Sequence, residues 1–155
     1  MTIVFLKGRD KRHTLSCIRD DGSKTWTSIQ NVFGPLHDIG HYAVESVLGF
    51  DGGFYGLLAQ GRSIQEFEET ADRSWIGPQG LQSEAVVMAL QYELAGVLPY
   101  ADFLEAVRAS CAGTGVPMPA GLNPAIHEVI LSRYRALLDD WEAVAPGETL
   151  TLQFP

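Results

Sequence analysis

The spacing of the apolar residues changes at about residue 34, and this change limits what the chain can fold into. Residues 13–19 alternate between two faces, with Leu15 and Cys17 on the same one, as in a strand with one buried side. From Gly34-Pro35 onward, most apolar residues recur every three or four positions, which is typical of amphipathic helices. Strands followed by a run of helices indicate an α+β domain.

Turn signals divide the first thirty residues into three expected strands. Gly8-Arg9-Asp10-Lys11 and Asp20-Asp21-Gly22-Ser23 are rich in the residues that favour tight turns. After Pro146-Gly147 a final segment alternates again, and we expect it to lie beside the N-terminal three-stranded meander. The expected strands of this small antiparallel sheet are residues 3–6, 13–19, 24–29 and 149–154.

About five or six helices are expected between these strands. Ser63 opens one of them, with Glu66 three residues later as a capping box. Residues 73–80 contain Gly77, Pro78 and Gly80 and are expected to form a loop. The expected helices are 34–48, 54–59, one from 63, 81–94, one from 99–102 to about 112, and 124 to about 144.

Composition indicates one globular domain, residues 1–155, because 46% of the residues are hydrophobic and 19% are charged. The formal net charge is −8 and no basic run is present, which argues against nucleic acid as a partner. No window is apolar enough for a bilayer span. The two cysteines form no C-x-x-C motif, and with no export signal at the start this suggests reduced thiols and a cytoplasmic protein.

The first expected helix carries Leu36-His37-Asp38-Ile39-Gly40-His41-Tyr42-Ala43-Val44-Glu45. Helical spacing places His37, His41 and Glu45 along one side. Imidazole and carboxylate groups in this arrangement suit a transition metal, most readily zinc. The motif therefore predicts zinc or another divalent metal, held mainly by His37 and His41.

A helical wheel places His37 at the border of the buried stripe and Glu45 toward solvent. His37, His41 and Glu45 span about 12 Å along the axis, too far for one ion to hold all three easily. Glu45 is therefore either a third ligand or the group that orients a ring N–H of His41. A fourth ligand must come from elsewhere. His127 is the leading candidate, and His13 is a weaker one.

The same segment resembles two known families of metal-binding helix. It is similar to the H-E-x-x-H helix of zincins, with Asp38 in place of the glutamate that activates water. His37-Asp38 also resembles the metal-binding pair of HD-domain phosphohydrolases. No further zincin ligand motif follows, and no helical histidine precedes residue 34. These resemblances imply a metal-dependent hydrolase in which Asp38 or Glu45 takes the proton from a metal-bound water.

Residues 36–61 also resemble a set of small uncharacterised bacterial proteins. The shared residues are His37-Asp38, His41, Val44-Glu45 and the segment Gly53-Phe54-Tyr55-Gly56-Leu57-Leu58-Ala59. This resemblance implies a compact domain and brings no activity with it.

Two other interpretations remain open at this stage. The histidines could form a metal-free catalytic pair, or they could be structural, with His41 paired to Glu45 at i,i+4. If they are structural, the chain is a non-enzymatic module that binds a partner or a second copy of itself. Its contact surface would include Phe54, Tyr55 and Trp75. Alternatively, Phe54 and Tyr55 could line a pocket beside His41 for a small-molecule ligand.

Overall fold

A computed structural model describes residues 1–10, 12–30, 34–69 and 73–155, and Lys11 of the predicted turn lies outside them. The α+β class is confirmed. Four strands form one antiparallel sheet in the order β3-β2-β1-β4, so the predicted meander and the C-terminal fourth strand are both present. The strands are β1 (Thr2–Leu6), β2 (His13–Ile18), β3 (Lys24–Ile29) and β4 (Thr149–Gln153).

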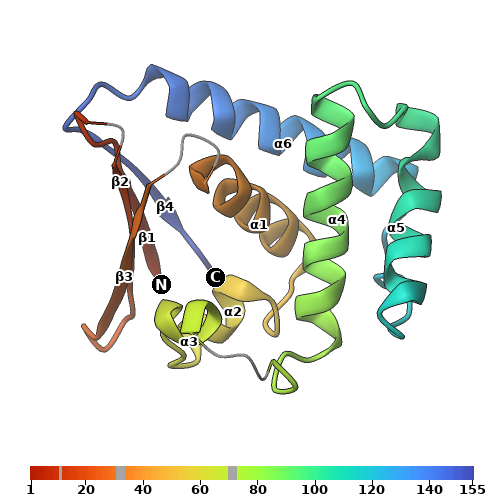
Figure 1. Ribbon diagram of the computed structural model, residues 1–155, viewed down its shortest axis with the longest axis horizontal. Coiled ribbons are helices and arrows are strands. Elements are labelled where there is room, and N and C mark those ends of the chain that lie inside the picture. The colour runs from red at the N-terminus through yellow and green to blue at the C-terminus, as the bar shows by residue number, and fades with distance from the viewer. Residues whose placement is uncertain (11, 31–33, 70–72) are drawn as a thin grey trace.

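One face of the sheet forms part of the hydrophobic core. Ile3 pairs with Cys17 and Phe5 pairs with Leu15 across β1 and β2, and all four side chains are buried. These residues alternate with more exposed ones, as the period of two requires. The helices therefore pack against a single face of the sheet, as Figure 1 shows.

Seven helical segments lie between β3 and β4 in the described residues. Helix α4 begins at Pro78 rather than at residue 81, so the last residues of the segment expected to be a loop are helical. Gly77 is its extended N-cap, and proline is favoured in a first helical turn because its missing N–H needs no partner there. The segments are α1 (Gly34–Leu48), α2 (Phe54–Ala59), α3 (Ile64–Glu69), α4 (Pro78–Leu94), the 3₁₀ turn η1 (Tyr100–Asp102), α5 (Phe103–Gly113) and α6 (Pro124–Ala143).

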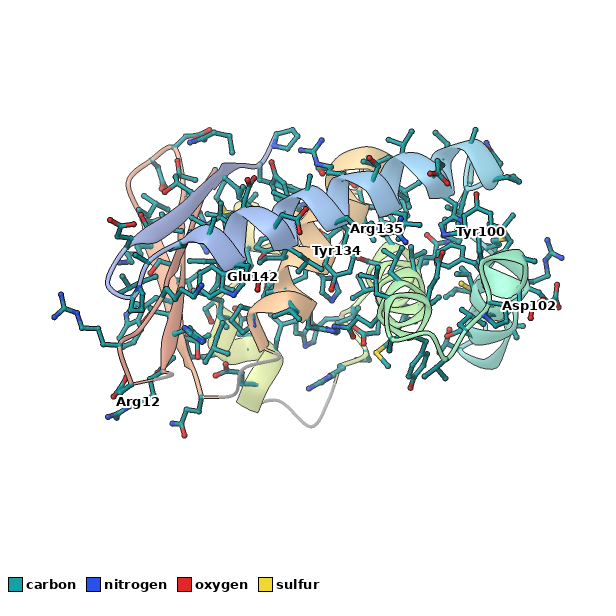
Figure 2. The ribbon with its side chains drawn as sticks, turned by 90° about the horizontal axis from the view of Figure 1, so that it is seen from above. Arg12, Tyr100, Asp102, Tyr134, Arg135 and Glu142 are labelled. Atoms are coloured by element: carbon teal, nitrogen blue, oxygen red, sulfur yellow. The ribbon has the colours of Figure 1, made fainter. Side chains whose placement is uncertain are left out.

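Helix α1 lies at the centre, between the sheet and α4 (Figure 1). Gly40 allows this close packing, because a Cβ atom there would lie 3.1 Å from the Val87 side chain on α4. Helix α6 runs across the molecule from α5 to the sheet (Figure 2). Its Tyr134 donates a hydrogen bond to the carbonyl oxygen of Leu36, at 2.9 Å. The start of α1 is thereby fixed against α6.

Helix α3 is attached to strand β3 by two hydrogen bonds. The Ile64 N–H donates to Oγ1 of Thr25 at 2.9 Å, and Nε2 of Gln65 donates to the carbonyl oxygen of Trp26 at 2.7 Å. These bonds fix α3 beside β3, the edge strand of the sheet. Among the described helices, none combines the length and apolar character needed to cross a bilayer.

Candidate metal centre

The two histidines of α1 point toward one another, as the i,i+4 spacing predicts. Their Nε2 atoms are 3.2 Å apart, and the rings meet edge to face. His41 is buried, whereas the His37 side chain is one-third exposed. The pair therefore lies at the border between the core and the surface.

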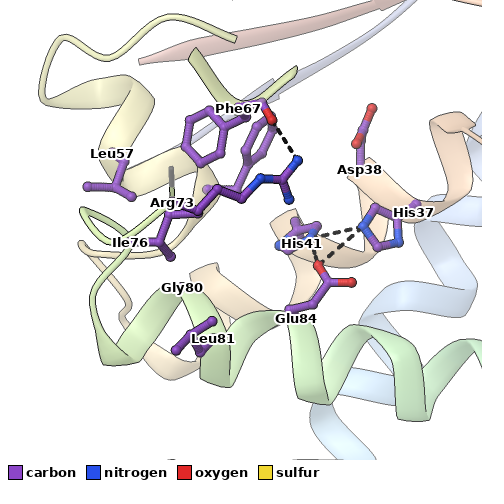
Figure 3. A pocket seen from close by; sticks show the side chains of 11 residues that line it. His37, Asp38, His41, Leu57, Phe67, Arg73, Ile76, Gly80, Leu81 and Glu84 are labelled. Atoms are coloured by element: carbon purple, nitrogen blue, oxygen red, sulfur yellow. Dashed lines mark hydrogen bonds and ion pairs between the residues drawn. The ribbon is translucent and has the colours of Figure 1, made fainter. Parts of the chain in front are cut away.

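Glu84 of α4 completes this group (Figure 3). Its Oε2 atom lies 3.2 Å from Nε2 of His41 and 3.5 Å from Nε2 of His37. His37, His41 and Glu84 form a group whose ligand atoms lie within 4.8 Å of one another and could hold a metal ion. The sequence analysis did not identify Glu84, since no local motif surrounds it and only the packing of α4 against α1 brings it to the histidines.

Glu45 lies on the other side of the His41 ring and is fully buried. The expectation that it tends toward solvent is therefore wrong. Its Oε1 atom is 3.1 Å from Nδ1 of His41 and accepts a hydrogen bond from the Ser83 hydroxyl at 3.0 Å. A carboxylate can only accept, so this contact places a proton on Nδ1 and leaves Nε2 as the ligand atom of a neutral ring.

Glu45 is buried because the segment after α1 folds back over its carboxylate. The backbone N–H groups of Phe54 and Tyr55 donate to the two carboxylate oxygens at 2.8 and 2.9 Å. These groups open α2, whose N-cap Gly53 supplies no side-chain cap. Glu45 thus caps a neighbouring helix whose first N–H groups would otherwise lack partners. A helical wheel of α1 alone does not include this contact.

The local charges favour a protonated His41 and an ionised Glu84. Burial lowers the pKa of His41, but hydrogen bonds to Glu45 and Glu84 outweigh that effect and raise the pKa to about 10. Hydrogen bonds from His37 and His41 hold the pKa of Glu84 well below its usual range. Without a metal, a shared proton therefore holds the cluster together.

Asp38 lies beside this cluster without joining it. Burial raises its pKa to about 6, although the nearby His41 and His37 act in the opposite direction. Its backbone oxygen accepts a hydrogen bond from the Tyr55 hydroxyl at 3.1 Å. Its side chain is half-buried and faces the same pocket as the histidines (Figure 3).

This pocket has a volume of about 430 Å³. The candidate metal-ligand group, which is His37, His41 and Glu84, forms part of its wall. Phe54 lines it, and its ring centroid is 5.6 Å from that of His41. Tyr55 instead lies in the core and is fully buried, so it cannot belong to an exposed contact surface. The Trp75 and Phe67 rings pack edge to face, with their centroids 4.9 Å apart. The lining residues are His37, Asp38, His41, Phe54, Leu57, Phe67, Arg73, Ile76, Gly80, Leu81 and Glu84.

The two other candidate ligands have partners of their own. His127 is buried on α6, with Nε2 only 2.7 Å from a carboxylate oxygen of Glu93. Its ring stacks on Phe103 with a centroid distance of 3.6 Å. His13 accepts a hydrogen bond from the Gly8 N–H. Neither residue belongs to the ligand group found in the described part of the chain.

No protein-family model matches this sequence, and no curated protein or solved structure is significantly similar to it.

Proposed function

We propose that the protein binds one divalent metal ion, most readily zinc, through Nε2 of His37, Nε2 of His41 and a carboxylate oxygen of Glu84. The observation that supports this most strongly is the spacing of the three ligand atoms. Two imidazoles and a carboxylate are a ligand set known from catalytic zinc sites.

The spacing agrees with tetrahedral coordination. Ligand atoms about 2.0–2.1 Å from an ion, at angles of about 109°, are separated by about 3.3 Å. The three separations here are 3.2, 3.2 and 3.5 Å. Binding needs loss of the shared proton and little movement of the side chains.

The surroundings favour a catalytic rather than a purely structural ion. Three protein ligands leave a fourth position for water, and structural zinc sites are typically closed by four. All three residues line the pocket, so a substrate in the pocket would reach the open position. Glu45 fixes the His41 ring from Nδ1, as outer carboxylates do for zinc-bound histidines.

We infer that such a centre hydrolyses a carbonyl compound, with Asp38 as the general base. A zinc ion bound there would supply an activated water. The Asp38 carboxylate would accept a proton from the attacking water as its oxygen bonds to the carbonyl carbon, and would return that proton to the leaving group as the bond from carbon to that group breaks. The place of Asp38 in the pocket wall, next in sequence to His37, supports this role.

Zinc binding is tested with protein purified without a histidine tag. We expect one zinc per chain by elemental analysis, and loss of binding in His37→Ala, His41→Ala and Glu84→Ala in calorimetric titrations. Glu142→Ala, an exposed helical glutamate outside the site, is the matched control and should bind zinc normally. Unchanged zinc stoichiometry in the His37→Ala, His41→Ala double variant would overturn the metal proposal.

The catalytic role has a separate test. Asp38→Asn should retain stoichiometric zinc but lose at least about 100-fold in hydrolytic rate, because general base catalysis typically contributes about 10²- to 10⁴-fold. Full activity in a zinc-loaded Asp38→Asn variant would remove Asp38 from the mechanism without affecting the metal site.

A further inference from the structure

The pocket beside the metal-ligand group combines apolar walls with one guanidinium. Its apolar lining comes from α2, α3, α4 and the loop before α4 (Figure 3). These apolar side chains are Phe54, Leu57, Phe67, Ile76 and Leu81. Such a lining suits the hydrocarbon part of a small molecule.

Arg73 introduces the positive charge. Figure 3 shows its side chain extending from the loop toward the side of the pocket that holds His41. One Nη atom donates to the carbonyl oxygen of Phe67 at 2.9 Å, which orients the guanidinium. An arginine can keep such a bond while its other N–H groups bind a carboxylate in a two-point contact.

The positive charge of Arg73 offsets the negative charge around the pocket. The chain has a net charge of −8, and Asp38 and Glu84 place two carboxyl groups in the same wall. An anionic ligand would be repelled there unless a cation compensates. Apart from the histidines, Arg73 is the basic residue among the described residues that line this pocket.

We propose that the pocket selects small amphipathic carboxylates, such as N-acylated apolar amino acids. Arg73 binds the carboxylate, Phe54 and Phe67 contact the apolar body, and the acyl carbonyl lies at the His37–His41–Glu84 centre. This substrate class rests on the metal-dependent hydrolysis proposed above. Water adds its hydroxyl to the acyl carbon and its hydrogen to the nitrogen, so the C–N bond is replaced by a carboxylic acid and an amine.

The test compares N-acetylphenylalanine with its uncharged amide, N-acetylphenylalaninamide. Dissociation constants are measured by calorimetry for wild type, Arg73→Gln and Arg135→Gln, each with and without zinc. Arg135 is an exposed arginine on α6 (Figure 2) and serves as the matched control. We expect wild type and Arg135→Gln to bind the acid at least about tenfold more tightly than the amide, because a charge-assisted two-point contact is lost in the amide.

Zinc-free Arg73→Gln should bind the acid and the amide with about equal affinity. An equal affinity of wild type for both compounds, no binding of either, or an unchanged preference in Arg73→Gln would overturn the role of Arg73. The zinc-free measurements separate this result from the metal proposal. If the protein failed to bind zinc but its preference for the acid still depended on Arg73, the metal centre would be refuted and the carboxylate pocket would stand.

Discussion

Gly53 gives the sharpest test of how Glu45 supports the site. A Cβ atom added there would lie 2.4 Å from Cδ of Glu45 and 2.6 and 2.7 Å from its two oxygens. Ordinary contacts of this kind begin at 3.4 Å. In Gly53→Ala the buried carboxylate must therefore move by about 1 Å, away from the N–H groups of Phe54 and Tyr55.

The cost follows from the hydrogen bonds that this movement disrupts. A hydrogen bond to a charged group contributes about 1.5–3 kcal/mol, so two of them represent about 3–6 kcal/mol. Alanine also restricts the unfolded chain relative to glycine, which offsets about 0.4–1 kcal/mol. Partial relaxation reduces the total further. We expect the free energy of unfolding to fall by about 2–4 kcal/mol, and Tm by about 5–15 °C for a chain of this size.

Gly77 provides the matched control for this substitution. It is also an extended N-cap glycine, on α4, and a Cβ atom there would meet nothing within 4 Å. Gly77→Ala should therefore change the free energy of unfolding by no more than about 0.5–1 kcal/mol. Urea denaturation followed by circular dichroism measures both variants. If Gly53→Ala were as stable as Gly77→Ala, the backbone N–H groups of Phe54 and Tyr55 would not hold the Glu45 carboxylate in place.

Three further predictions concern other buried groups. Glu45→Gln places an amide NH₂ against backbone N–H donors and should lower the free energy of unfolding by about 2–3 kcal/mol. It should also weaken zinc binding by about 10- to 100-fold. Undiminished zinc affinity by calorimetry would contradict the orienting role of Glu45. His127→Ala leaves Glu93 buried without its partner and should cost about 3–5 kcal/mol in urea denaturation, while elemental analysis still finds one zinc per chain; loss of zinc would instead make His127 a ligand. Burial raises the pKa of Cys17 from 9.0 to about 12, so above pH 9 the unfolded chain loses this proton first and stability falls by up to about 1.4 kcal/mol per pH unit. Denaturation between pH 8.5 and 10 should show that this contribution to the fall in stability is absent in Cys17→Ala. Identical pH profiles of stability in wild type and Cys17→Ala would count against a buried thiol.

Local patterns predicted the fold class and the histidine pair because both depend on neighbours in sequence. Alternation and turn residues mark the strands, and a helical spacing of four brings His37 to His41. Glu84 follows His41 by 43 residues, and the packing of α4 against α1, which is close at Gly40, brings the two residues together. Glu45 was placed toward solvent since a helical wheel contains no information about the segment that folds over it.

The two carboxylates at His41 show why burial decides their roles. Glu45 is fully buried, and backbone N–H groups and a serine hydroxyl bind its oxygens. A metal at Glu45 would have to replace several bonds at once, each with a desolvation cost. The Glu84 side chain is 51% exposed, and its Oε2 atom contacts the two Nε2 atoms that would share an ion. Replacing the proton on Nε2 of His41 by zinc would keep His37 and His41 as the partners of Glu84, so we propose the ligand role for Glu84 and the positioning role for Glu45.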